Sequence, residues 1–262
     1  MTLFLSLPFW ALLLITVVIF YLALEVGRAA GARRRDHLDG ARDELGSMVG
    51  AMLALLGFIL AITFGTQLQR FDTGKQLLRS EASAIHQTWL LAEMMPARYR
   101  DEARGILRDY VDVRADNRGD LSERIGRSER MQSALWRICL AGVAEMDEHY
   151  PRELLLESLN QLISLHEQRV AVSVREHMPV VFWIVLFALA ILTFGLAGYQ
   201  AGMAGSPRNA ARPIAVVGFA LLVLLIADLD RPGHGGLRFD QYALEYVAKR
   251  MDTHATSGGS DR

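Results

Sequence analysis

Charged side chains cluster where a long apolar segment gives way to hydrophilic sequence. This cluster consists of Arg70, Asp72, Arg79 and Glu81. Glu81 follows a run of helix formers beside an apolar stripe, so we expect it to be partly buried. A buried carboxylate is costly unless a cation neutralises it, and Arg70 and Arg114 are its candidate partners. The cluster is either a salt-bridge network that braces a domain or a charged vestibule in which Arg70 attracts anions.

A second acidic pair closes the last apolar segment. Asp228 and Asp230 lie at its end, and a glycine-rich turn, 233–236, follows. Carboxylates at a bilayer edge, followed by a turn, can ligate a hard cation such as Ca²⁺. Two carboxylates are few for such a site, and Arg231 is an adjacent counter-charge. We therefore favour a helix cap or a salt bridge here, with calcium as the alternative.

Motifs of enzyme chemistry are absent from the sequence. It contains no His-Glu-x-x-His, no zinc-ligand spacing, no Gly-x-Ser-x-Gly and no glycine loop for a nucleotide. His166 lies on an apolar stripe, where a core histidine is the simpler interpretation. The single cysteine, Cys139, rules out an internal disulfide. The net charge of −1 gives no reason to expect a nucleic-acid partner. We predict a non-enzyme without a cofactor.

The second apolar segment, 46–65, is uncharged over twenty residues, enough to cross a bilayer as a helix. Its small residues recur at steps of three and four, so they share one helix face. We call this face the small-residue stripe; it consists of Gly46, Gly50, Ala54, Gly57, Ala61 and Gly65. Such a face suits close helix packing, within a subunit or between subunits. Alternatively it lines a pore, where small side chains leave room for an ion.

Three further apolar segments complete a membrane-embedded unit. They span 3–24, 179–199 and 214–227, and the last needs its flanks to cross a bilayer. The hydrophilic stretch between the second and third spans has helical periodicity and no alternation at period two. The predicted fold is all-α: an integral membrane protein with four transmembrane helices and a helical soluble domain.

The chain thus divides into four predicted parts. Residues 1–69 hold the first two spans and a short charged loop, and 70–177 form the soluble domain of about four helices. Residues 178–230 hold the third and fourth spans. The last part, 231–262, contains an amphipathic helix and a disordered tail that begins at Thr253. With four spans, both termini lie on the same side as the soluble domain. Basic residues near the spans number seven on each side, so charge does not decide the orientation.

Several short motifs resemble a bacterial membrane family described as bestrophin-like. The motifs are Leu55-Leu56-Gly57-Phe58, Arg70-Phe71-Asp72, Glu81-Ala82-Ser83-Ala84-Ile85, Tyr110-Val111-Asp112-Val113-Arg114 and Leu229-Asp230-Arg231-Pro232. The resemblance covers roughly residues 5–250 and extends, more distantly, to the bestrophins, which are homopentameric anion channels.

The resemblance carries its own expectations. It implies a homo-oligomer, a pentamer if fully bestrophin-like, with the second span at the axis and a chloride-like permeant anion. Matching Gly57-Phe58 places Phe58, Ala54 and Gly50 at the neck of the pore. It also implies a multi-pass protein of the bacterial inner membrane, with the soluble domain and both termini in the cytoplasm. The alternative is a non-conducting scaffold whose helical domain docks a soluble partner.

Overall fold

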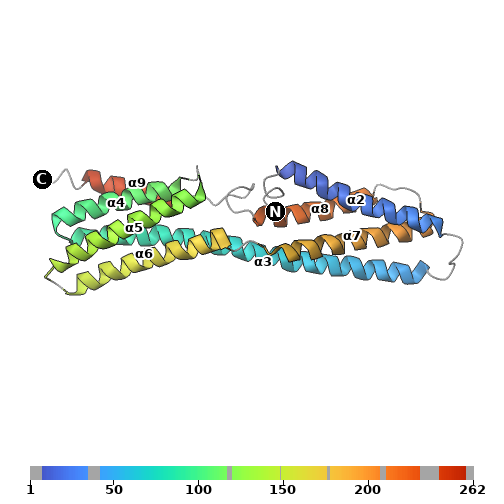
Figure 1. The fold of residues 1–262 in the computed structure, drawn as a ribbon, viewed down its shortest axis with the longest axis horizontal. Helices are drawn as coiled ribbons and strands as arrows, with labels where there is room; N and C mark the ends of the chain where they lie inside the picture. Colours follow the sequence, from blue (N-terminus) through green and yellow to red (C-terminus); the bar gives the residue numbers. More distant parts are fainter. Residues whose placement is uncertain are drawn as a thin grey trace. The chain divides into compact units, whose positions relative to one another are not determined.

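Helices account for all the regular secondary structure in the described part of the chain. The computed structural model describes residues 8–34, 42–116, 120–147, 149–175, 178–206, 211–230 and 242–257. The elements are α2 (Phe9–Arg33), α3 (Arg42–Leu91), the 3₁₀ helix η2 (Ala92–Met94), α4 (Ala97–Ala115), α5 (Leu121–Ala144), α6 (His149–Arg175), α7 (Val180–Met203), α8 (Ala211–Leu229) and α9 (Tyr242–Ser257). The predicted all-α class is confirmed (Figure 1).

Four of these helices are long and apolar enough to cross a membrane, as predicted. They are the candidate spans Trp10–Arg33, Glu44–Met94, Val180–Met203 and Ala211–Leu229. The fourth begins at Ala211 and so includes the flank that its apolar core, 214–227, needs to reach bilayer thickness. Proline is tolerated in the first turn of a helix, and Pro213 occupies such a position in α8.

The chain forms two compact units. The membrane unit comprises the described parts of 1–71 and 177–238, and the soluble unit comprises those of 72–176 and 239–262. The last helix, α9, therefore belongs with the soluble unit rather than forming a separate part. It also extends to Ser257, into the stretch expected to be a disordered tail. The Thr253 hydroxyl donates to the Arg250 carbonyl at 2.9 Å, which supports this last turn; residues 258–262 lie outside the described part.

The second span and the first apolar stripe of the soluble domain are parts of one helix. α3 runs for 50 residues and contributes to both units. No proline interrupts it, and the polar residues after Gly65 all have side chains that a helix accommodates. It ends at Leu91, and η2 continues the chain to Met94, just before the pair Met95–Pro96, because the residue before a proline is disfavoured in the helical region. Met95 accordingly has an extended backbone, with ψ 157°.

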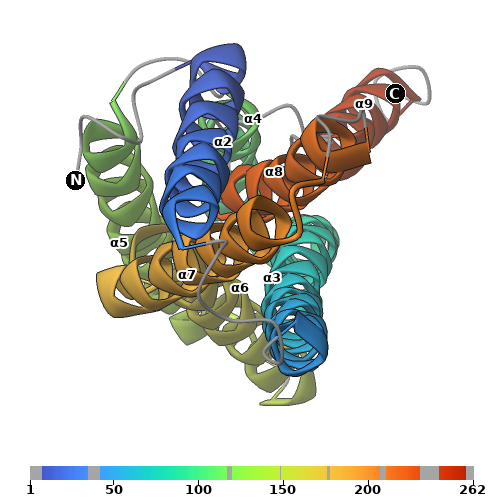
Figure 2. The ribbon, with the colours of Figure 1, turned by 90° about the vertical axis from the view of Figure 1, so that its right-hand side faces the viewer.

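Helices α2 and α7 are the most closely packed pair in the membrane unit (Figure 2). Their contact is made of glycines. A Cβ added at Gly27 would clash with the backbone of Gly195, and one added at Gly198 would clash with the backbone oxygen of Leu24. Small residues four apart let membrane helices approach until their backbones touch. Gly27 and Gly31 on α2, with Gly198 and Gly202 on α7, have this spacing.

The membrane unit also has a core of bulky apolar side chains. Phe20 of α2 stacks on Phe194 of α7, with ring centroids 5.2 Å apart. α3 joins this core through Leu56 and Leu60. Because these side chains are bulky, α3 lies farther from its neighbours than α2 lies from α7, where glycines allow close contact. The spans otherwise present apolar side chains outward, as expected for a surface that lipid or another subunit covers.

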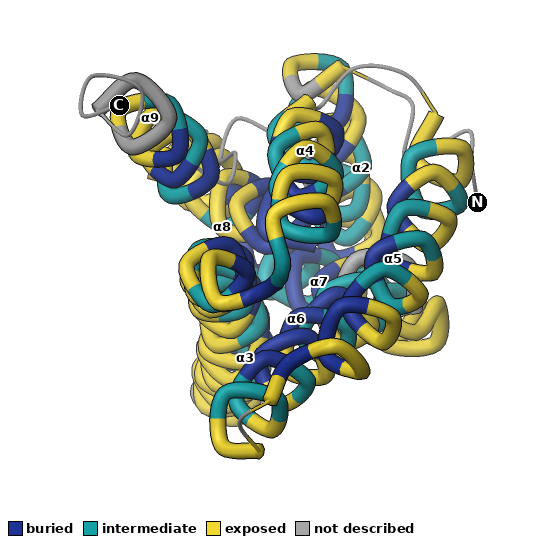
Figure 3. The backbone as a smooth tube through the Cα atoms, turned by 90° about the vertical axis from the view of Figure 1, so that its left-hand side faces the viewer, coloured by how far each residue is buried: buried dark blue, intermediate teal, exposed yellow. Residues whose placement is uncertain are grey.

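The soluble unit is a helical bundle in which each helix buries one face (Figure 3). α4 packs against α5 and α9, and α5 packs against α6. Leu107 of α4 and Leu159 of α6 are fully buried in the core. α9 contributes Leu244 and Met251 to that same core, and its Asp252 forms an ion pair with Arg108 of α4.

Candidate functional site

A single carboxylate lies at the centre of the soluble unit's core. Glu81 of α3 has no exposed surface, and two guanidiniums bind its oxygens. Arg114 of α4 donates from Nε to Oε1 at 2.9 Å and from Nη2 to Oε2 at 3.1 Å. Arg169 of α6 donates from Nη1 to Oε2 at 2.6 Å. Such charge-assisted bonds are about twice as strong as neutral ones, and the Arg114 pair is bidentate.

The Tyr110 hydroxyl extends this network. It donates to Oε1 of Glu81 at 3.1 Å and accepts from the Gln132 amide at 2.9 Å. His166 Nδ1 lies 3.1 Å from the same hydroxyl. Because the hydroxyl proton is already directed to Glu81, Nδ1 must be the protonated ring nitrogen that donates. Four helices therefore meet through side chains at one point, with Gln132 supplied by α5. We call Glu81, Tyr110, Arg114, Gln132, His166 and Arg169 the Glu81 cluster.

Spacing within each helix brings these side chains together. Tyr110 and Arg114 are four residues apart on α4, and His166 and Arg169 are three apart on α6, so each pair shares a helix face. That face carries apolar core residues on either side, Leu107 on α4 and Leu162 on α6. The apolar stripes that bury the bundle thus also bury the charges.

The electrostatics of the cluster favour permanent ionisation of Glu81. Burial raises the pKa of its carboxyl, but neighbouring His166 and the guanidiniums of Arg114 and Arg169 outweigh this and hold the pKa well below its usual value. Burial, with the nearby Glu81 charge, raises the pKa of Tyr110 far above its usual value. Burial also lowers the pKa of Arg169, since Glu81 only partly compensates it.

These shifts limit what the cluster can do chemically. Neither Glu81 nor Tyr110 changes protonation near neutral pH, so neither suits general acid–base catalysis there. One carboxylate between two guanidiniums leaves a net charge of +1. The arrangement is suited to holding α3, α4, α5 and α6 in one register.

The structure brings together only part of the charge network predicted from sequence. The Glu81–Arg114 pair is present, and the predicted members Asp72 and Arg79 lie apart from it. Asp72 and Arg79 are exposed, because they lie on other faces of α3 than Glu81. Four members were not predicted, namely Tyr110, Gln132, His166 and Arg169. One sequence signal could have indicated two of them: His166 lies on an apolar stripe, and Arg169 follows it by three residues on the same helix face.

The small-residue stripe of α3 lies open within the described part of the chain. A Cβ added at Gly50, Gly57 or Gly65 would meet no atom within 4 Å, and Ala54 and Ala61 are exposed. Only Gly46 has a near neighbour, the Gln200 side chain of α7, at 3.1 Å from such a Cβ. The intrachain glycine packing is made by α2 and α7 instead, so the stripe remains available to another subunit or to a pore.

Asp230 has a structural partner at the end of the fourth span. Its Oδ1 accepts from the backbone N–H of Met178 at 2.9 Å, just before α7 begins. This bond ties the segment before α7 to the end of α8 and satisfies a buried backbone amide just outside the helix. Asp228 is also buried. No group of three His, Cys, Asp or Glu residues suited to a metal ion occurs in the described ranges.

A family model described as a bestrophin-like domain matches residues 11–241, which include all but the start of the first span, the other three spans and the Glu81 cluster. The chain belongs to the bestrophin-like family. This bestrophin-like chain also resembles the crystal structure of a bacterial bestrophin homolog from Klebsiella pneumoniae, solved with a point mutation. The TM-score is 0.60 at 14% identity, over 93% of this chain and 97% of that one. No curated protein sequence matches.

The likeness to the Klebsiella protein concerns the fold, since identity is low. It spans nearly the whole of both chains, so the bestrophin-like fold includes the membrane spans and the helical unit alike. The family resemblance expected from the sequence motifs is thereby confirmed. A channel-type membrane protein is consistent with both comparisons.

Proposed function

We propose that this chain assembles into a homo-oligomeric ring, a pentamer by analogy with bestrophins, that conducts small anions such as chloride. α3 lies at the axis of each ring, with its small-residue stripe facing the pore. The observation that carries the proposal is the open stripe: an uncharged helix face on which, beyond Gly46, the described chain packs nothing against Gly50, Gly57 or Gly65. Membership of the bestrophin-like family supports the same function.

The exposed residues of α3 divide by size. The stripe carries only glycine and alanine, whereas another sector of the same helix exposes Met48, Leu55 and Ile62, with Phe58 64% exposed. Small side chains leave room for an ion, and an apolar wall can gate by losing its water. The bulky sector suits contact with lipid or with the neighbouring copy. Phe58 lies between the two sectors, which supports its assignment to the narrowest ring of the proposed neck.

Arg70 follows the stripe by little more than one turn after Gly65. It is five full turns from Met52, so it lies on the face of α3 opposite the stripe and does not line the proposed pore. We place the pore in the bacterial inner membrane, with the soluble unit and both termini in the cytoplasm, as in bestrophins.

Two measurements test the channel. The mass of the detergent-solubilised full chain gives the number of subunits, and a monomer or dimer would contradict the ring. Chloride efflux from vesicles containing the purified protein then reports conduction. In a pore, Gly57→Leu should leave the subunit number unchanged and abolish efflux, because five added side chains obstruct the axis. Loss of the assembly instead would assign the stripe to packing between subunits.

The matched control is Gly218→Leu. Gly218 of α8 also has no atom within 4 Å of an added Cβ and lies in a membrane span. It should leave both mass and efflux unchanged. A confirmed pentamer that passes no chloride, or equal inhibition by Gly57→Leu and Gly218→Leu, would contradict the proposed pore.

A second candidate function is a scaffold whose soluble unit docks a partner. It is favoured by a groove of about 380 Å³ between α3 and α6, lined by Gln87, Leu90, Leu91, Leu154, Glu157, Ser158 and Gln161. Leu90 is 44% exposed there, so the groove offers an apolar contact at its edge. Leu90→Gln should leave chloride efflux unchanged in a channel. If vesicles containing the wild-type protein show no chloride efflux, whatever its subunit number, the scaffold would be favoured.

A further inference from the structure

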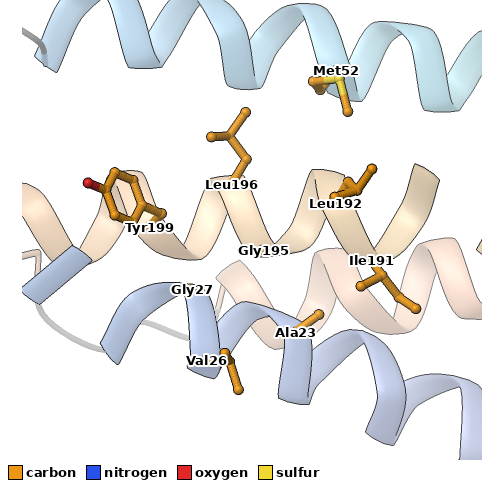
Figure 4. A pocket seen from close by; sticks show the side chains of 9 residues that line it. All are labelled: Ala23, Val26, Gly27, Met52, Ile191, Leu192, Gly195, Leu196 and Tyr199. Carbon is orange, nitrogen blue, oxygen red and sulfur yellow. The ribbon is translucent and has the colours of Figure 1, made fainter. Parts of the chain in front are cut away.

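An apolar groove runs along the outside of the membrane unit between α2, α3 and α7. Its volume is about 560 Å³. The lining residues are Ala23, Val26, Gly27, Met52, Ile191, Leu192, Gly195, Leu196 and Tyr199 (Figure 4). All are apolar except for the Tyr199 hydroxyl, which Figure 4 shows at one end of the groove.

The floor of the groove is backbone. Gly27 and Gly195 meet there, and a Cβ at Gly27 would clash with Gly195. The close approach of α2 and α7 therefore keeps the floor free of side chains, while Leu192, Leu196 and Met52 form the sides. The groove opens outward, since Val26 is 68% exposed and Leu192 is 63% exposed. In helices that span a bilayer, such an opening faces hydrocarbon or a neighbouring subunit.

Positive charge continues the groove at its Tyr199 end. Arg33 follows Val26 by seven residues, and Arg34 follows Gly27 by seven, so each arginine lies nearly on the face of the groove-lining residue. Seven residues of helix place each arginine about 10 Å further along the α2 axis than the groove-lining residue. Both arginines are exposed, at the end of α2. Tyrosine at the same level is typical of the membrane–water interface.

We propose that this groove binds an anionic phospholipid, with an acyl chain along the Gly27–Gly195 floor and the phosphate at Arg33 and Arg34. The groove supplies hydrocarbon contact without a polar group to desolvate, and the arginines supply the charge that a phosphate complements. Charge complementarity distinguishes this occupant from a second copy, which an apolar groove alone would accept equally well. The site is separate from the α3 stripe, because Met52 lies on the opposite side of α3 from it.

Native mass spectrometry of the full chain in detergent tests the proposal, because it reports subunit number and bound lipid together. The probes are dioleoyl phosphatidylglycerol, which is anionic, and dioleoyl phosphatidylcholine, which is zwitterionic. The wild-type protein should retain phosphatidylglycerol in preference to phosphatidylcholine. The double substitution Arg33→Gln and Arg34→Gln should weaken phosphatidylglycerol binding roughly 30-fold and leave phosphatidylcholine nearly unchanged, at about fivefold per arginine.

A matched pair on α7 tests the acyl chain. Leu192→Trp fills the groove and should reduce binding of both lipids. Ile184→Trp, at a residue of equal exposure (62%) outside the groove, should reduce neither. Unchanged phosphatidylglycerol binding in Leu192→Trp or in the arginine variant would overturn the proposal. So would a changed subunit number in Leu192→Trp with lipid binding intact, which would assign the groove to a second copy.

Discussion

Arg169 Nη1 lies 2.6 Å from Oε2 of Glu81, across 88 positions of sequence. The bond joins α6 to α3 inside the soluble unit, and Arg114 holds the same carboxylate from α4. Because all three side chains are largely shielded from water, the carboxylate is the only compensation that the two guanidiniums have within the Glu81 cluster. The stability of this unit should therefore depend strongly on Glu81.

The first prediction is that Glu81→Gln destabilises the soluble unit by about 3–5 kcal/mol, because it leaves two buried cations uncompensated. Thermal unfolding of the full chain in detergent, followed by circular dichroism, measures this. Glu93→Gln is the control: Glu93 pairs with Arg104 on the surface, with its side chain 54% exposed. Loss of a surface pair costs less than about 1 kcal/mol. Equal shifts in the two variants would mean that the cluster contributes no more than a surface pair.

The Glu81 contribution should also depend on pH. The folded-state pKa of Glu81 lies below its usual value of 4.5, so the unfolded chain takes up the proton first as pH falls. The stabilisation is complete above that value and declines below it. Unfolding midpoints of wild type and Glu81→Gln should differ most near pH 7 and converge below about pH 4.5. A difference that grows on acidification would contradict the assigned direction.

Tyr110→Phe should destabilise the unit by about 1–3 kcal/mol, because it leaves the Gln132 amide and His166 Nδ1 without their buried acceptor. Urea unfolding of the full chain, monitored by tryptophan fluorescence, gives the change. Tyr150→Phe is the matched control, since Tyr150 is 70% exposed. It should shift the midpoint negligibly.

In the membrane unit, two neighbouring glycines of α7 should differ in their tolerance of the same substitution. Gly198→Ala places a methyl group against the backbone oxygen of Leu24, whereas in Gly195→Ala the methyl group lies 3.8 Å from the backbone oxygen of Ala23, an ordinary van der Waals contact. Overpacking of this kind costs about 1–3 kcal/mol or more. The yield of folded, monodisperse protein from membranes should therefore fall for Gly198→Ala alone. Similar yields for both variants would show that α2 and α7 are farther apart than described.

Cys139 should be inert to thiol reagents in the folded protein. It is fully buried, and burial raises the pKa of its thiol to about 11. Maleimide labelling of wild type should be negligible without denaturant, so introduced cysteines can report topology. Arg34→Cys and Arg127→Cys should label from opposite sides of the membrane, with Arg127→Cys accessible from the cytoplasm. Labelling of both from one side would contradict the four-span topology.

Much of the architecture follows from local patterns. Uncharged stretches of membrane length predicted the spans, and period-3.6 stripes predicted the soluble helices, because burial of one face is what each pattern encodes. The Glu81–Arg114 pair was foreseeable for the same reason: a carboxylate beside an apolar stripe requires a cation. The choice of Arg114 over Arg70, and the addition of Arg169, was not foreseeable. It depends on which helices adjoin α3.

The glycines show the same division. Sequence alone determined that this chain has helices with smooth faces, since Gly and Ala spaced three and four apart make such a face in any helix. It did not determine which face another helix would occupy. The tertiary structure pairs Gly27 with Gly195 and leaves Gly57 open. The reason is physical: close approach needs small residues on two helices at the same height, and only the folded arrangement brings α2 and α7 to that register.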